Sequence, residues 1–176
     1  MRLLRNSAGF TLLELVVVVM IVALLAAMAT AGYRHARIRS SEAATIAALN
    51  AINQAQFAYM QSCGNQRYAP SLAALGVTPP GHDAPFISPD LAVSDPLSKS
   101  GYLFQLSGTP ATEGGPTCTG DVPLDSYRLT ADPLQPGVSG ARYFGTNTDR
   151  VIYAADASLA EEMPEKGRPG RGEEIR

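Results

Sequence analysis

The chain has few of the side chains that usually perform chemistry. Its 176 residues include two histidines and two cysteines, so a zinc site made from these ligands would need all four or help from carboxylates. His35 lies beside an apolar segment and His82 lies in a loop rich in proline and glycine. No pattern typical of a serine hydrolase, a zinc protease or a phosphate-binding loop is present. The sequence therefore predicts a protein that is not an enzyme and holds no metal or cofactor.

The two cysteines, Cys63 and Cys118, stand 55 positions apart and form no CxxC pair. This spacing favours one structural disulfide in an oxidising compartment over a redox motif. Two free thiols are the alternative.

The charge balance gives no sign of a nucleic-acid partner. Sixteen acidic and fourteen basic residues leave a formal charge of -2, whereas surfaces that bind polyanions are usually basic. The acidic residues of the second half are too scattered for the several oxygen ligands that calcium requires, so no calcium site is expected. The residues considered as calcium ligands are Asp121, Asp125, Asp149 and Asp156.

One acidic residue, Glu14, lies inside an otherwise uncharged apolar run at residues 10–31. The run has no proline or glycine, and as a helix it would extend for about 33 Å, enough to cross a bilayer. A carboxylate in a helix that faces hydrocarbon costs about 2.5 to 3.5 kcal/mol on insertion scales. We therefore expect Glu14 to have a function. Residues 1–9, which include Arg2 and Arg5, form a short basic leader in front of the run.

The string GFTLLEL at residues 9–15, between the leader and the apolar run, resembles the N-terminus of type IV pilins and of the pseudopilins of type II secretion systems. The resemblance implies that a membrane-embedded prepilin peptidase cuts between Gly9 and Phe10 and N-methylates Phe10. It also implies that Glu14 is needed for assembly, and that the other partners are identical or related pilin subunits and an inner-membrane assembly platform. The protein would then lie in the inner membrane with its head in the periplasm, and later in an extracellular pilus or a periplasmic pseudopilus.

The positively charged amine of Phe10 in one subunit could offset the buried Glu14 of a neighbour, so that polymerisation satisfies a charge that a single subunit cannot bury alone. Two alternatives remain open. The triplet at residues 29–31 has the A-x-A form of an ordinary signal-peptidase site, and cutting there would release a soluble domain that begins at Gly32. The leader could also anchor a periplasmic binding or enzymatic domain in the membrane.

Residues 32–62 contain no proline, and their larger apolar side chains fall on one side of a helix. These side chains are Ile38, Ile46, Leu49, Ile52, Phe57 and Met60. With the apolar run, they predict one helix of about 80 Å, of which the first half lies in lipid and the second packs under a domain. Glu42, Asn53 and Gln56 interrupt the apolar side. These polar residues weaken the match to the core face of a soluble protein, but they would allow polar contacts with neighbouring subunits.

After residue 62 the composition changes, because eleven of the thirteen prolines lie at residues 70–136. Residues 71–76 predict a short helical turn and residues 78–99 a long loop. Short segments that mix aromatic, branched and polar residues predict strands joined by turns. These segments are residues 101–106, 126–131, 141–145 and 150–155.

Residues 63–159 are therefore expected to form a globular head with an antiparallel sheet, and the aromatic residues of its strands are expected to form the core. Residues 160–176 mix five acids with four bases, two prolines and three glycines, which predicts a disordered tail. The expected fold class is α+β, with a long N-terminal helix packed against a small antiparallel sheet.

Overall fold

The computed structural model describes residues 9–113 and 115–175, apart from the side chains of residues 28–31. The chain divides into two compact units, residues 1–37 and residues 38–176. One helix, α1 (Leu12–Ser62), contributes residues to both. The helix that the sequence predicts is thus present, and it begins close to the expected residue.

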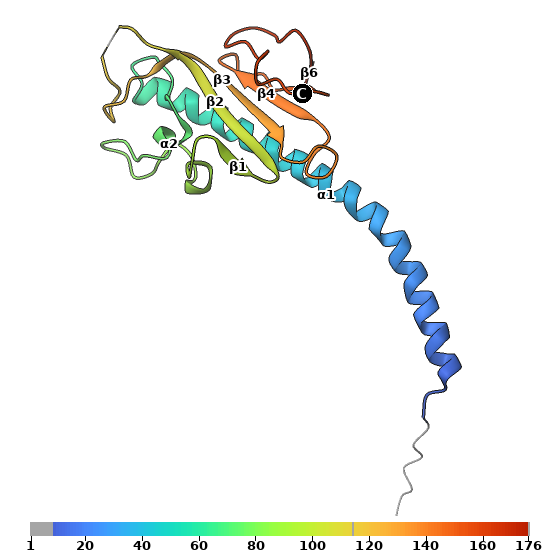
Figure 1. Ribbon diagram of the computed structural model, residues 1–176. Coiled ribbons are helices and arrows are strands. Elements are labelled where there is room, and N and C mark those ends of the chain that lie inside the picture. The colour runs from blue at the N-terminus through green and yellow to red at the C-terminus, as the bar shows by residue number, and fades with distance from the viewer. Residues whose placement is uncertain (1–8, 114, 176) are drawn as a thin grey trace, which may run out of the picture. The chain divides into compact units, whose positions relative to one another are not determined.

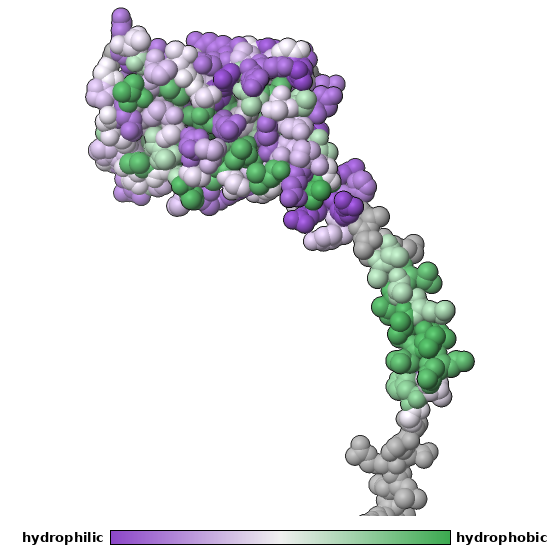
Figure 2. Space-filling view, in the orientation of Figure 1, coloured by the Kyte–Doolittle hydropathy of each residue, from purple (hydrophilic) through white to green (hydrophobic). Residues whose placement is uncertain are grey.

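In the first unit, α1 begins where a threonine caps its free N–H groups. The side-chain oxygen of Thr11 accepts a hydrogen bond from the backbone N–H of Glu14 at 3.2 Å, as an N-cap residue does. All side chains of residues 12–27 are exposed, and Figure 2 shows them as an almost continuous apolar surface. By length and composition, α1 is the one helix among the described residues that could cross a membrane.

The second unit contains an antiparallel sheet of six strands, in which each strand lies beside the next one in the sequence (Figure 1). The strands are β1 (Leu97–Lys99), β2 (Tyr102–Pro110), β3 (Leu124–Pro133), β4 (Tyr143–Asn147), β5 (Tyr153–Ala155) and β6 (Glu173–Glu174). The four predicted strands correspond to β2, β3, β4 and β5. The predicted α+β fold with an antiparallel sheet is confirmed.

The head core lies between the sheet and the part of α1 that belongs to the second unit (Figure 1). Leu49, Ile52 and Tyr59 of α1 are fully buried in one apolar cluster with side chains of the strands. The strand residues of this cluster include Tyr102, Phe104, Tyr127, Leu129 and Phe144. Burial of each large apolar side chain in this way contributes about 1.5 to 3 kcal/mol to the stability of the folded head. The aromatic residues therefore form the sheet core, as the sequence predicts.

Two short helices follow α1 in the sequence and precede the first strand. The predicted turn at residues 71–76 contains α2 (Leu72–Leu75), which is capped by the Ser71 side chain. The predicted loop at residues 78–99 includes the single turn η1 (Pro89–Leu91) and ends in β1. β1 was missed because its three residues do not make a recognisable strand pattern. It forms by pairing with β2, where Leu97 lies opposite Phe104.

The prediction of a disordered tail is wrong for residues 160–175. Met163 is fully buried with Leu159, Tyr153 and Ala155 in a second apolar cluster, and β6 pairs with β5 at the edge of the sheet. Met163 lies next to Gly145 of β4, on the sheet face opposite the one on which Phe144 packs with α1. The sequence gives no apolar periodicity here because the tail packs mainly through single side chains and backbone atoms.

A carboxylate fixes this tail to the sheet. Glu165 accepts hydrogen bonds from the backbone N–H and the hydroxyl of Thr109, at 3.2 Å and 3.1 Å, and also from the Ser126 hydroxyl. Arg128 donates to the Met163 carbonyl at 3.2 Å. Burial by itself raises the pKa of Glu165, but its hydrogen bonds to Ser126 and Thr109 outweigh this effect and lower the pKa below its ordinary value.

Candidate functional site

The predicted processing site lies in an open stretch of backbone. Gly9 and Phe10 precede α1, have no regular secondary structure and are exposed, with 82% of the Phe10 surface accessible. A side chain at Gly9 would meet no described atom within 4 Å. The bond between these two residues is therefore accessible in the described part of the chain, directly before the capped start of a helix.

Glu14 lies in the first turn of α1, three residues after the Thr11 cap. The pattern Thr-x-x-Glu is the sequence signature of a capping box, of which the structure shows the bond from the Glu14 N–H to the Thr11 hydroxyl oxygen. The partial positive charge at a helix N-terminus favours a carboxylate there. The helix end supplies only a partial charge and not a counter-ion. Among the described residues, no basic side chain forms an ion pair with its carboxylate. Sequence reasoning missed the role of Thr11, although the Thr-x-x-Glu pattern was visible.

Glu42 has its polar partners within the same chain, whereas the sequence also allowed contacts with neighbouring subunits. One oxygen of its buried carboxylate accepts hydrogen bonds from the backbone N–H groups of Ala141 and Arg142, at 3.0 Å and 3.2 Å. The other oxygen accepts from the Arg142 guanidinium at 2.9 Å and 2.8 Å. A buried carboxylate is stable only when paired in this way, so Glu42 fixes α1 to the segment before β4.

Asn53 and Gln56 are also satisfied inside the head rather than by neighbours. The Asn53 amide donates to the Thr146 hydroxyl at 2.9 Å and accepts from the Tyr127 hydroxyl at 2.9 Å. Gln56 accepts from the Ala69 N–H at 2.8 Å and donates to the Ala69 carbonyl at 3.2 Å. Both side chains are buried. Polar interruptions of the apolar side therefore set how α1 lies on the sheet.

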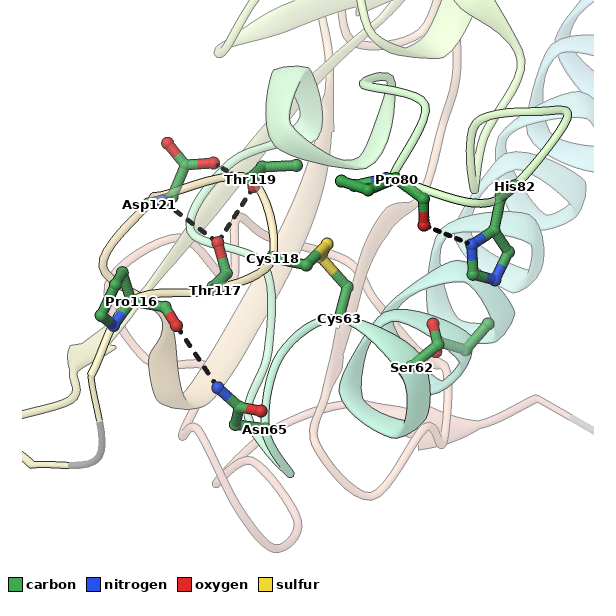
Figure 3. Close-up of a disulfide and its surroundings, with 11 residues drawn as sticks. Ser62, Cys63, Asn65, Pro80, His82, Pro116, Thr117, Cys118, Thr119 and Asp121 are labelled. Atoms are coloured by element: carbon green, nitrogen blue, oxygen red, sulfur yellow. Dashed lines mark hydrogen bonds between the residues drawn. A yellow bond between two sulfur atoms is a disulfide. The ribbon is translucent and has the colours of Figure 1, made fainter.

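Cys63 and Cys118 form a disulfide, as the sequence predicts. Figure 3 shows that it joins the end of α1 to the loop between β2 and β3. Hydrogen bonds support the same junction: the Cys118 N–H donates to the Cys63 carbonyl at 3.0 Å, and the Asn65 amide donates to the Pro116 carbonyl at 3.3 Å. The disulfide closes the head across 55 positions of sequence.

The histidines and the other metal-ligating residue types are dispersed over the described part of the chain. No three His, Cys, Asp or Glu side chains gather there as a set of metal ligands. His35 is exposed on α1, and the His82 ring lies in the loop near the Pro80 carbonyl. Burial raises the pKa of Tyr102 and of Tyr127. The raised pKa values of these phenols mean that both remain protonated and can donate hydrogen bonds in the core.

Comparison with known proteins identifies the N-terminal region. Residues 4–30 match the prokaryotic N-terminal methylation motif, and this match includes Gly9, Phe10 and Glu14. The N-terminal segment is a prepilin-type methylation motif. The chain is also distantly homologous to the type IV wide pilus major component PilA4 of Thermus thermophilus, with 38% identity over 72 residues. These residues make up 41% of this chain and 53% of that protein, so the similarity spans about half of the curated relative.

No solved structure matches the chain. Pilins are structural proteins rather than enzymes, and the two matches therefore agree with the prediction of a non-enzymatic chain. The match to the methylation motif ends at residue 30.

Proposed function

We propose that the protein is a pilin-like structural subunit of a type IV pilus, polymerised through its N-terminal helix. One observation carries the proposal: a prepilin-type motif leads directly into α1, whose side chains from residue 12 to residue 27 are exposed. Exposed apolar surface of this extent needs lipid or another protein to cover it. In this proposal the apolar N-terminal part of α1, up to about residue 31, lies in the inner membrane first and then in the centre of a filament.

The proposed processing follows from the residues at the start of α1. Prepilin peptidase cuts between Gly9 and Phe10 and N-methylates Phe10, which leaves a positively charged amine four residues before Glu14. In the filament, the amine of one subunit pairs with Glu14 of a neighbour. Transfer of apolar side chains from lipid to a helix bundle changes little in hydrophobic energy, so packing and this charge pair would decide how the subunits assemble.

Mass spectrometry of the mature N-terminus tests the proposal. A chain that begins with methylated Phe10 is the expected result, whereas a chain that begins at Gly32 would mean that signal peptidase releases a soluble domain. Shearing of intact cells then separates the remaining cases. Recovery in the sheared filament fraction is expected for a pilus subunit, retention in a periplasmic filament would identify a pseudopilin of a type II secretion system, and retention in membranes without filaments would identify an anchored periplasmic domain.

A further inference from the structure

A short segment of α1 directly after the apolar run carries exposed groups that suit a lipid headgroup region. Residues 33–37 read Tyr-Arg-His-Ala-Arg, and all five side chains are exposed. Tyrosine is enriched at membrane interfaces because it has an apolar ring and a polar tip. Arginine binds phosphate through several N–H donors in one plane.

Arg34 and Arg37 have no acidic partner in the described part of the chain, where the ion pairs involve other residues. The sequence has no aspartate or glutamate between Glu14 and Glu42, so no carboxylate lies within one turn of either arginine. Three residues apart on a helix, the two arginines point in directions about 60° apart. Both guanidinium groups are thus free to approach the same anionic surface.

The depth of this segment fits the headgroup layer if the apolar run fills the hydrocarbon core. At 1.5 Å per residue, Arg34 lies about 4.5 Å and Arg37 about 9 Å beyond residue 31. The headgroup layer on each side of a bilayer is about 5 to 7 Å thick, and long arginine side chains can bend toward it. Tyr33 lies at the boundary itself.

We propose that residues 33–37 form a binding surface for acidic phospholipids, in which Arg34 and Arg37 bind lipid phosphate groups and Tyr33 lies at the hydrocarbon boundary. This inference rests on the proposed membrane insertion of α1. It adds a lipid preference that insertion alone does not require. Such a surface holds the unassembled subunit at a defined depth and releases it when α1 leaves the bilayer.

The test uses the full chain reconstituted in vesicles of phosphatidylcholine. One preparation contains spin-labelled phosphatidylglycerol, and a second contains spin-labelled phosphatidylcholine. Electron paramagnetic resonance measures the association of each labelled lipid with the protein. We expect the unmodified protein to prefer phosphatidylglycerol. In the variants Arg34→Gln and Arg37→Gln, this preference should fall about fivefold for each arginine replaced, because one basic residue near an anionic membrane contributes about that factor. Added salt should weaken the preference.

Two further variants separate a local site from general charge. Lys166→Gln with Arg168→Gln removes the same charge from exposed residues of the head and should leave the preference unchanged. The double variant Arg34→Lys, Arg37→Lys retains the positive charge and should keep most of the preference for phosphatidylglycerol. An unchanged preference in the Arg34→Gln and Arg37→Gln protein, or an equal loss in the Lys166 and Arg168 variant, would overturn the inference.

The outcomes also separate this inference from the proposed function. A protein that restricts no labelled lipid at all is not inserted, and the proposed function then fails as well. If the protein inserts and assembles but shows no preference for phosphatidylglycerol, the lipid site alone is refuted. If the glutamine variant loses filaments while its lipid preference stays unchanged, the two arginines bind neighbouring subunits instead, and the lipid site is again refuted.

Discussion

Replacement of Glu14 by glutamine separates its two possible roles, which are helix capping and charge pairing. Glutamine also serves at the third position of a capping box, so Glu14→Gln keeps the helix start that Thr11 caps. The substitution removes the negative charge. It therefore loses the helix-dipole contribution of about 0.3 to 1 kcal/mol and the proposed pair with the amine of a neighbouring Phe10.

The expected losses differ enough to be measured. Removal of one partner of a buried ion pair costs about 3 to 5 kcal/mol, which corresponds to a decrease in subunit association of about two to three and a half orders of magnitude. Thr11→Ala retains Glu14 but loses the N-cap, at a cost of about 1 kcal/mol, or about fivefold. We therefore expect Glu14→Gln to abolish most filaments and Thr11→Ala to retain most of them.

The assay compares sheared filaments by immunoblot at equal expression, after mass spectrometry has verified processing at Gly9 and Phe10. Processing must be checked first because Thr11 lies next to the expected cleavage site. Thr11→Ser, which keeps a capping hydroxyl, is the matched control. Filament yields from Glu14→Gln within about fivefold of the unmodified protein, or an equal loss in Thr11→Ala, would refute the charge-pairing argument.

Three predictions concern the head. Reduction of the bond between Cys63 and Cys118 frees a loop of 55 positions and should lower the free energy of unfolding by about 4 kcal/mol, measured by thermal unfolding with and without reductant; a Cys63→Ala, Cys118→Ala protein should show no response to reductant. Glu42→Gln should cost about 1 to 3 kcal/mol, because it weakens buried charge-assisted hydrogen bonds, and a denaturant midpoint equal to that of the unmodified protein would contradict this role. Glu165 has a lowered pKa in the folded state, so its stabilisation is complete above its ordinary pKa and is lost as the pH falls through the lower folded value. Glu165→Gln should therefore flatten the acid side of the stability profile, as followed by circular dichroism, and an unchanged profile would exclude this contribution.

The N-terminal region was readable from sequence because its signals are local. The GFTLLEL string, the uncharged run around Glu14 and the absence of proline up to residue 62 lie in adjacent residues. Helix formation and membrane compatibility depend on such neighbours. The disulfide was also predictable, since Cys63 and Cys118 are the only two cysteines and no alternative pairing exists within the chain.

Tertiary structure alone decided the partners of the polar residues and the fate of the tail. Glu42 and Arg142 lie 100 positions apart, and no periodicity or motif connects them. Their meeting depends on the register of the sheet and on how α1 packs against it. Residues 160–175 look unstructured because they lack a repeating apolar pattern. Met163 is nevertheless buried, and Glu165 accepts hydrogen bonds from three donors. Strands that are distant in sequence form the surface against which these two side chains pack.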